Sequence, residues 1–188
     1  MKMMIDASFG RANCCGYPPY PFPPQPTPPQ PFPPTPAPPV PFPPAEPDTL
    51  SVQLATAQTA LANGAAIPMT GLLRQTGNGL SYDAASRAVL VTEPGVYEFN
   101  WNVLVQSDGA AADAVIALQS LDGQTVLGVS GAAEVPTTGG TQISGNAVAF
   151  LPAGTAWALV NVSGAAVNIP VAGTAPNVFA ASMTVTEA

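Results

Sequence analysis

The chain contains no histidine among its 188 residues, and it carries only four lysines plus arginines against 11 aspartates plus glutamates. Without histidine, the commonest general base and the commonest metal ligand are both missing. The net charge of −7 provides no positive field to neutralise phosphate groups, which disfavours binding to nucleic acids and to anionic membranes. We therefore expect no enzymatic activity, no cofactor and no metal, and neither nucleic acid nor membrane as a partner.

Long apolar runs are also missing. No stretch approaches the roughly 20 apolar residues that span a bilayer. The amino-terminal sequence MKMMIDASFGRANCC lacks the run of about seven or more apolar residues that a secretory signal requires. We expect the chain to be made in a cytosol and to reach its destination without a secretory signal peptide.

Proline, in contrast, is abundant in one segment. Residues 21–45, PFPPQPTPPQPFPPTPAPPVPFPPA, are five copies of the pattern PxPPx. Proline fixes φ at about −65° and pushes the preceding residue into extended geometry, so the segment predicts a polyproline II rod. We expect residues 17–48 to form a semi-rigid stalk whose phenylalanines spiral around the rod: Phe22, Phe32 and Phe42. A second interpretation is a ligand for aromatic-lined grooves of the SH3 type, although no basic residue flanks the repeats.

The first 16 residues, here called the N-terminal tip, hold the chain's two cysteines, Cys14 and Cys15. Neighbouring cysteines rarely bond to each other because the peptide between them strains the disulfide geometry. We predict disulfides to other chains, with free thiols in a reducing cytosol and metal binding as alternatives. The tip also has apolar side chains suited to docking on a neighbouring protein: Met3, Met4, Ile5 and Phe9.

The body, residues 49–188, alternates short apolar runs with Gly, Pro, Asn and Asp, which is typical of an all-β sandwich or barrel. In the clearest strand, residues 96–106, apolar side chains from Tyr97 to Val105 alternate with polar ones. Residues 54–66 are the nearest helix candidate and suit a strand leading to a turn equally well. Other runs predict further strands at residues 114–121, 125–131, 147–153, 156–162 and 178–186. The run AWALVNV, residues 156–162, is apolar on both faces and must be buried on both, either inside a sandwich or against a neighbouring subunit, and we favour an oligomer.

Three stretches of the body carry a family resemblance: GNGLSYDAASRAVLVTEPGVYEFNWNV, GNAVAFLPAGTAWALVN and NVFAASMTVTEA. In this order they resemble the carboxy-terminal heads of collagen-like proteins on bacterial spore surfaces, which share the trimeric jelly roll of the tumour-necrosis-factor (TNF) and complement globular-head superfamily. PGVYEF matches the strand that starts the family's core, and LPAGTAWAL matches its hairpin before a buried strand. The resemblance covers residues 49–188 and implies a jelly-roll β-sandwich homotrimer. The stalk departs from the family, because PxPPx stands in place of Gly-X-Y and a collagen triple helix requires glycine at every third position.

The resemblance implies a place on the spore surface, or exosporium. We expect a structural subunit of a spore-surface fibre or endospore appendage, in which trimeric heads join head-to-tail through the tip and stalk. Its main partner is then a second copy of itself, with a spore-coat or exosporium protein as an anchor. The alternative is a terminal adhesive or ligand-binding trimeric head anchored to another surface or fibre protein.

Two further site hypotheses are weaker. A Ca²⁺ site at Asp108 or Asp113 is an alternative to solvated loop charges, a group that includes Asp122, but the spacing is not that of an EF-hand. The sequence Asn161-Val162-Ser163 fits the glycosylation sequon. It lies in a predicted buried strand of a chain that we expect to lack a signal peptide, and we discount it.

Overall fold

A computed structural model describes residue 21, residues 24–25, residue 27, residues 46–171 and residues 180–188. Within these residues the secondary structure is all β, and no helix could span a membrane. The predicted tip and most of the predicted stalk lie outside the described residues, so their roles stay predictions. This holds for each residue singled out there: Met3, Met4, Ile5, Phe9, Cys14, Cys15, Phe22, Phe32 and Phe42.

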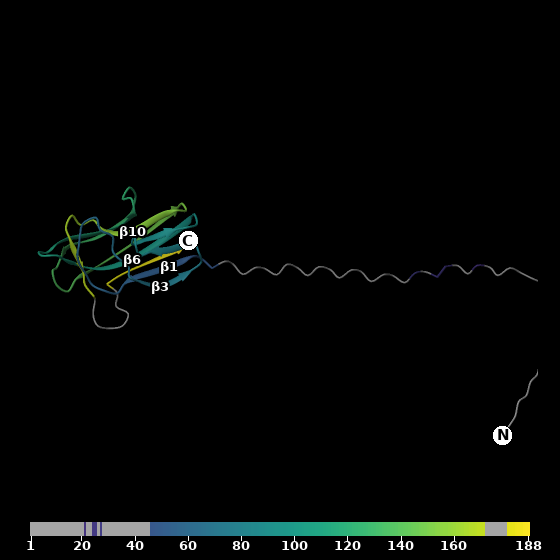
Figure 1. Ribbon diagram of the computed structural model, residues 1–188, viewed down its shortest axis with the longest axis horizontal. Helices are drawn as coiled ribbons and strands as arrows, with labels where there is room; N and C mark the ends of the chain where they lie inside the picture. The colour runs from purple at the N-terminus through teal and green to yellow at the C-terminus, as the bar shows by residue number, and fades with distance from the viewer. Residues whose placement is uncertain (1–20, 22–23, 26, 28–45, 172–179) are drawn as a thin grey trace, which may run out of the picture. The chain divides into compact units, whose positions relative to one another are not determined.

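The strands of the head form two antiparallel sheets that pack as a sandwich (Figure 1). The strands are β1 (Thr49–Leu54), β2 (Gln58–Leu61), β3 (Gly71–Thr76), β4 (Leu80–Asp83), β5 (Ala88–Val91), β6 (Gly95–Ser107), β7 (Ala112–Ser120), β8 (Val126–Val135), β9 (Thr141–Leu151), β10 (Thr155–Asn161), β11 (Val167–Ile169) and β12 (Ala181–Glu187). The seven-stranded sheet has the order β2-β11-β6-β12-β1-β3, with β9 also paired to β6. The five-stranded sheet has the order β4-β5-β10-β7-β8. Thus β9 and β8 are neighbouring edge strands of the two sheets.

One end of the sandwich collects several strand ends. Thr49 at the start of β1 pairs with Thr186 near the end of β12, and Gly95 at the start of β6 pairs with Leu151 at the end of β9. The backbone N–H of Ala188 donates to the carbonyl of Val96 at 2.9 Å. We call this end, where β1 and β6 begin and β9 and β12 end, the basal end.

The core forms where the predicted strand pattern places it. In β6, Tyr97, Phe99, Trp101, Val103 and Val105 are all buried, and the residues from Glu98 to Asn102 that alternate with them are exposed. The prediction for this strand is confirmed. The segment 54–66 contains the end of β1 and all of β2, so it is strand and turn rather than helix.

The strand β10 is buried on both faces, as its sequence predicts. Trp157 and Leu159 lie in the main core, while Ala158 and Val160 pack with Ala88 in a second small cluster on the opposite face. Both faces of β10 are therefore buried within one chain. The segment before β3 helps to cover the second face of β10. The N–H of Ile67 donates to Leu159 O at 2.8 Å, and Ala66 packs against the second cluster. Of the two alternatives for this doubly apolar strand, β10 takes burial inside one domain, because small alanines and a crossing segment cover its second face. The strand itself therefore gives no evidence for or against an oligomer.

The indole of Trp101 closes the sandwich at the β8–β9 edge. Gly145 lies opposite Trp101 in the β6–β9 register, and a Cβ atom on Gly145 would overlap the indole ring. On the other side, a Cβ on Gly128 of β8 would lie 2.8 Å from the indole Cη2. The indole Nε1 donates to the hydroxyl of Ser130, also on β8, at 2.8 Å. Two glycines therefore form a slot that only the absence of side chains makes wide enough for the indole.

Candidate self-association surface and basal pocket

The outer face of the seven-stranded sheet is apolar near the basal end. Val148 and Phe150 of β9 are 61% and 68% exposed, and Val96 of β6, which pairs with Phe150, is exposed as well. Farther along, the same face carries uncharged amides and hydroxyls: Asn100, Asn102, Gln142, Ser144 and Asn146. The hydroxyl of Ser144 donates to Asn102 Oδ1 at 2.6 Å. The part of this face formed by β6 and β9 is therefore neutral except for Glu98, and its basal part is hydrophobic. Arg74 lies on the same face at the opposite edge of the sheet, on β3.

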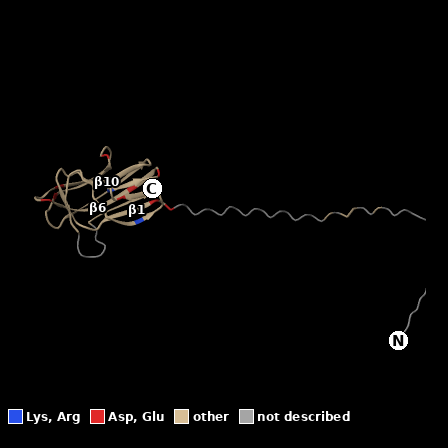
Figure 2. Ribbon diagram, in the orientation of Figure 1, with Lys and Arg blue, Asp and Glu red and all other residues tan. Residues whose placement is uncertain are grey.

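The edge strand β8 of the other sheet runs beside β9, with Gly128 facing Ala147. Its exposed Val129 pairs with Ala117 and lies on the outer face of the five-stranded sheet, so it is not part of this surface. We call the exposed apolar residues of the seven-stranded face the apolar edge: Val96, Val148 and Phe150. Charged residues are sparse over the strands of the head (Figure 2). Exposed apolar side chains that gather on unpaired edge strands mark an association surface, because burying them removes apolar area from water.

The sequence of β9 does not reveal this surface. In residues 147–151, AVAFL, the larger Val148 and Phe150 alternate with the smaller Ala147 and Ala149. Alternation indicates which residues share a face but not which face turns inward when both are apolar. The small residues turn inward because the indole of Trp101 occupies the space beneath β9.

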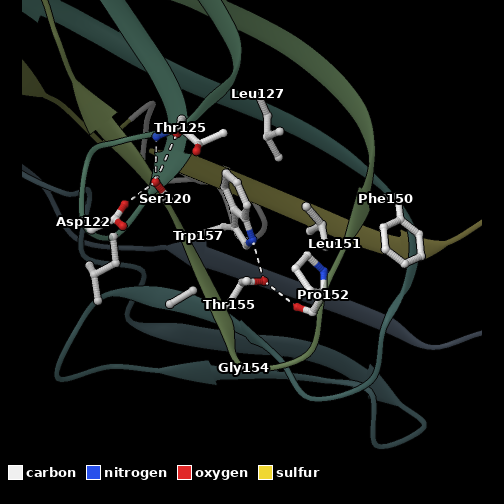
Figure 3. A pocket seen from close by; sticks show the side chains of 12 residues that line it. Ser120, Asp122, Thr125, Leu127, Phe150, Leu151, Pro152, Gly154, Thr155 and Trp157 are labelled. Carbon is white, nitrogen blue, oxygen red and sulfur yellow. Dashed lines mark hydrogen bonds between the residues drawn. The ribbon is translucent and has the colours of Figure 1, made fainter.

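A pocket of about 710 Å³ opens at the basal end, beside the apolar edge (Figure 3). It lies where β7 and β9 end and β8 and β10 begin. Its lining consists of Ser120, Leu121, Asp122, Thr125, Leu127, Phe150, Leu151, Pro152, Gly154, Thr155, Ala156 and Trp157. The Trp157 Nε1 donates to Thr155 Oγ1 at 3.0 Å, and Thr155 Oγ1 donates to Pro152 O at 2.9 Å. The volume lies within the range of about 300–1,000 Å³ typical of ligand clefts.

The one charged group in the pocket lining stabilises its own loop. Asp122 Oδ1 accepts hydrogen bonds from the Ser120 hydroxyl at 2.5 Å and from the Gln124 N–H at 3.0 Å. These hydrogen bonds, that of Ser120 above all, lower the pKa of the Asp122 carboxyl. The lining offers hydroxyls but no basic side chain to activate them as nucleophiles. The pocket is therefore suited to binding an uncharged, partly apolar group.

The other predicted carboxylates also support their loops. Asp108 Oδ1 accepts from Asn168 Nδ2 at 3.2 Å, and Asp113 Oδ1 accepts from the Glu134 N–H at 3.0 Å. Within the described residues, no three His, Cys, Asp or Glu side chains gather in a group that could hold a metal ion. The structure thus offers no observation in favour of the Ca²⁺ alternative.

The structure also gives a physical reason to discount the sequon. Asn161 is fully buried, and its Nδ2 donates to Leu61 O at 2.9 Å and to Ala165 O at 2.8 Å. Its Oδ1 accepts from the Ser163 N–H at 3.0 Å. The amide nitrogen to which a glycan would attach is therefore already committed to two carbonyls. Asn161 joins three loop segments and has a structural role.

The basal end is electronegative. The Tyr97 hydroxyl donates to Glu93 O at 2.9 Å, and the Asp48 carboxylate accepts from the Gly79 N–H at 2.8 Å. Burial raises the pKa of Tyr97, and the nearby charges of Glu187, Asp48 and Glu93 raise it further. An anionic partner is therefore disfavoured at this end of the head.

Comparisons with known proteins identify the fold. No protein-family model matches the chain, and no curated protein matches it in sequence. Solved structures do match. The structure of murine APRIL has 12% sequence identity to this chain and a TM-score of 0.56, and the match covers 76% of this chain and 100% of APRIL. Eiger TNF from S. frugiperda matches at 12% identity with a TM-score of 0.58, and the match covers 76% of this chain and 93% of that one. The globular domain of zebrafish complement 1qA matches at 14% identity with a TM-score of 0.52, and the match covers 73% of this chain and 94% of that one.

The head is a TNF-like and complement-like jelly roll. This confirms the predicted all-β jelly-roll class for the described residues. At these identities the likeness concerns the fold, and what the head binds or assembles with has to be argued from its own residues.

Proposed function

We propose that this chain is a structural subunit of a spore-surface fibre or endospore appendage, built from homotrimeric heads joined head-to-tail through the N-terminal tip and stalk. The observation that carries the proposal is the apolar edge of the head, with Val148 and Phe150 largely exposed beside an uncharged polar face. The likeness of residues 49–188 to spore-surface heads supports the trimer and the exosporium location.

The charge of the head favours assembly. Residues 49–188 contain two arginines and eight acidic residues, so their net charge is two minus eight, or −6. Spread over a whole domain, this leaves little like-charge repulsion to keep copies apart, and the apolar edge itself carries none. Burying one Val or Phe side chain contributes about 1.5–3 kcal/mol, so a few per interface stabilise an oligomer.

The tip and stalk provide the link between heads. A tip that grips the next head makes a heterologous contact, and such a contact propagates into an open filament when it does not close into a ring. A trimer presents three tips, so weak individual contacts add up to durable attachment. The stalk acts as a semi-rigid spacer between neighbouring heads.

The alternative function is a terminal adhesive or ligand-binding head, anchored through the tip to a spore-coat or exosporium protein. The basal pocket beside Trp157 favours this candidate, because it is large enough for a ligand. The two candidates differ in whether the purified chain polymerises on its own.

Removing residues 1–16 tests the proposed function. Electron microscopy of the full-length chain is expected to show fibres with a regular spacing of heads, and the truncated chain is expected to show separate heads. The described core is built from residues of the head, Leu50 to Val185, so the truncated head is expected to fold as before. Separate heads in both samples would contradict the filament and favour the anchored head.

The cysteine pair gives a second prediction. Replacing both with serine, C14S with C15S, is expected to leave fibres assembled but less resistant to heat and detergent, because covalent links between chains are lost. Head association is expected to stay unchanged, measured by sedimentation velocity on the same samples. If fibres of the double variant survive heat and detergent as well as the original, the tip does not form disulfides between chains.

A further inference from the structure

The basal pocket and the start of β1 lie at the same end of the head. Phe150 belongs both to the pocket and to the apolar edge, and Thr49 begins β1 at this end. We propose that the pocket binds the proline-rich segment, residues 31–45, of a neighbouring copy in the assembly. This inference rests on the self-association proposed above and adds the identity of the group that fills the pocket.

The chemistry of the lining matches a polyproline segment. Polyproline II has no internal hydrogen bonds and a backbone that is already ordered, so apolar grooves with aromatic walls bind it at a low entropic cost. The pocket offers the exposed ring of Phe150 and Pro152, with the aliphatic side chains of Leu121 and Leu127 around them, while Trp157 is buried at its base. Leu121 is 51% exposed, so it offers apolar area that an occupant would cover.

Charge matching points to the same occupant. Residues 17–45 contain no lysine, arginine, aspartate or glutamate. In the pocket, the Asp122 carboxylate already accepts from Ser120 and Gln124 and stays at the loop. An uncharged segment brings no charge of its own out of water when it docks here. Removing a charge from water is the costly part of burying most other segments.

The segment comes from a neighbouring copy rather than from the same chain. Within the sheet, β12 and β6 lie between β1 and β9, and the pocket lies on the far side of β9, toward β8. At about 4.8 Å between strands, the start of β1 is roughly 14 Å from β9. Proline fixes φ at about −65° and favours an extended backbone, so we expect the segment of the same chain to continue away from β1 rather than to reverse toward β9. In a ring of subunits, a copy packed on the apolar edge brings its own basal end beside this pocket.

Binding at this site would give the assembly a defined geometry. Each head would hold the stalk of its neighbour close to the point where it leaves β1, so the stalks would leave the ring in one common direction. A semi-rigid spacer keeps two heads at a fixed separation only when the end that joins the head is held in one orientation. The pocket therefore explains how a stalk without a triple helix keeps its direction.

A photo-crosslinking experiment on the full chain tests the inference. Benzoyl-phenylalanine replaces Phe42 in chains labelled with ¹⁵N, which are mixed with unlabelled chains before assembly and irradiation. Mass spectrometry is expected to find crosslinks to residues 120–127 or 150–157 of the chain with the other label. The same probe at Phe22, far from the head in the sequence, is the matched control and is expected to give no crosslink to these residues.

Two further variants locate the contact and separate this inference from the proposed function. L121D adds a charge to the pocket and is expected to lower the crosslink yield at least about tenfold. L72D changes a leucine that is 58% exposed on β3, outside the pocket, and is expected to leave the yield unchanged. Crosslinks elsewhere on the head, crosslinks within one chain only, or equal yields in both variants would overturn the inference. Sedimentation velocity on the same samples reports association: associated chains without pocket crosslinks refute this inference alone, whereas monomers refute the self-association itself.

Discussion

Replacing Gly145 with alanine is expected to lower the free energy of unfolding by about 3 kcal/mol or more. The added Cβ would overlap the Trp101 indole, which Gly128 confines from the other side. The ring cannot move without breaking its 2.8 Å hydrogen bond to Ser130 or entering the packed core. Urea unfolding monitored by tryptophan fluorescence measures this loss in the free energy of unfolding. The matched control is N146A at the next residue, which is exposed and is expected to change the free energy of unfolding by less than about 0.5 kcal/mol.

A double variant tests the stated cause. Phenylalanine at position 101 lacks the outer part of the indole, so W101F should relieve the overlap caused by the new Cβ. We expect the loss in W101F with G145A to be smaller than the sum of the two single losses by about 1 kcal/mol or more. Strict additivity would mean that Gly145 does not act through Trp101 and that the slot is not what closes the β8–β9 edge.

Two aspartates on the apolar edge are expected to dissociate the heads. V148D with F150D places charges where we propose that a neighbouring copy packs, and it removes two apolar contacts worth about 1.5–3 kcal/mol each. A loss of at least about 3 kcal/mol raises the dissociation constant by more than about 100-fold. Both side chains are largely exposed, so the fold should survive, which circular dichroism can check. Sedimentation velocity is expected to show monomers.

The opposite edge of the same sheet provides the control for this experiment. Leu72 and Leu73 of β3 are exposed leucines, and L72D with L73D introduces the same number of charges there. This control is expected to keep the oligomer. If the control dissociates and the variant of the apolar edge does not, the association surface lies at β3 and the proposed arrangement of heads is incorrect.

Much of the fold could be predicted from local patterns. The strand of residues 96–106 alternates large apolar and polar side chains, so one face had to be core, and β6 has this arrangement. The same patterns left residues 54–66 open between a helix and a strand, and the structure shows strand and turn there. The association surface could not be predicted in the same way. Val148 and Phe150 belong to a strand that is apolar on both faces, and larger side chains are ordinarily expected inside.

The pocket could not be predicted from the sequence for a different reason. The lining comes from two segments that are far apart in the sequence, residues 120–127 and 150–157, and only the sheet order brings them together at one end of the head. No spacing rule links such residues. The resemblance to spore-surface heads predicted the jelly roll but gave no indication of a cavity at this place.

The sequence by itself determined that the body is all-β, that β6 is half-buried, that the chain is sparsely charged and that a proline-rich segment precedes the head. These properties follow from composition and from side-chain period, which act over a few neighbouring residues. Only the tertiary structure decided which face of β9 turns outward and how β10 is covered on both sides. The reason is volume: the Trp101 indole fills the space opposite Gly145, so the small side chains of β9 turn inward and the larger ones are left on the surface.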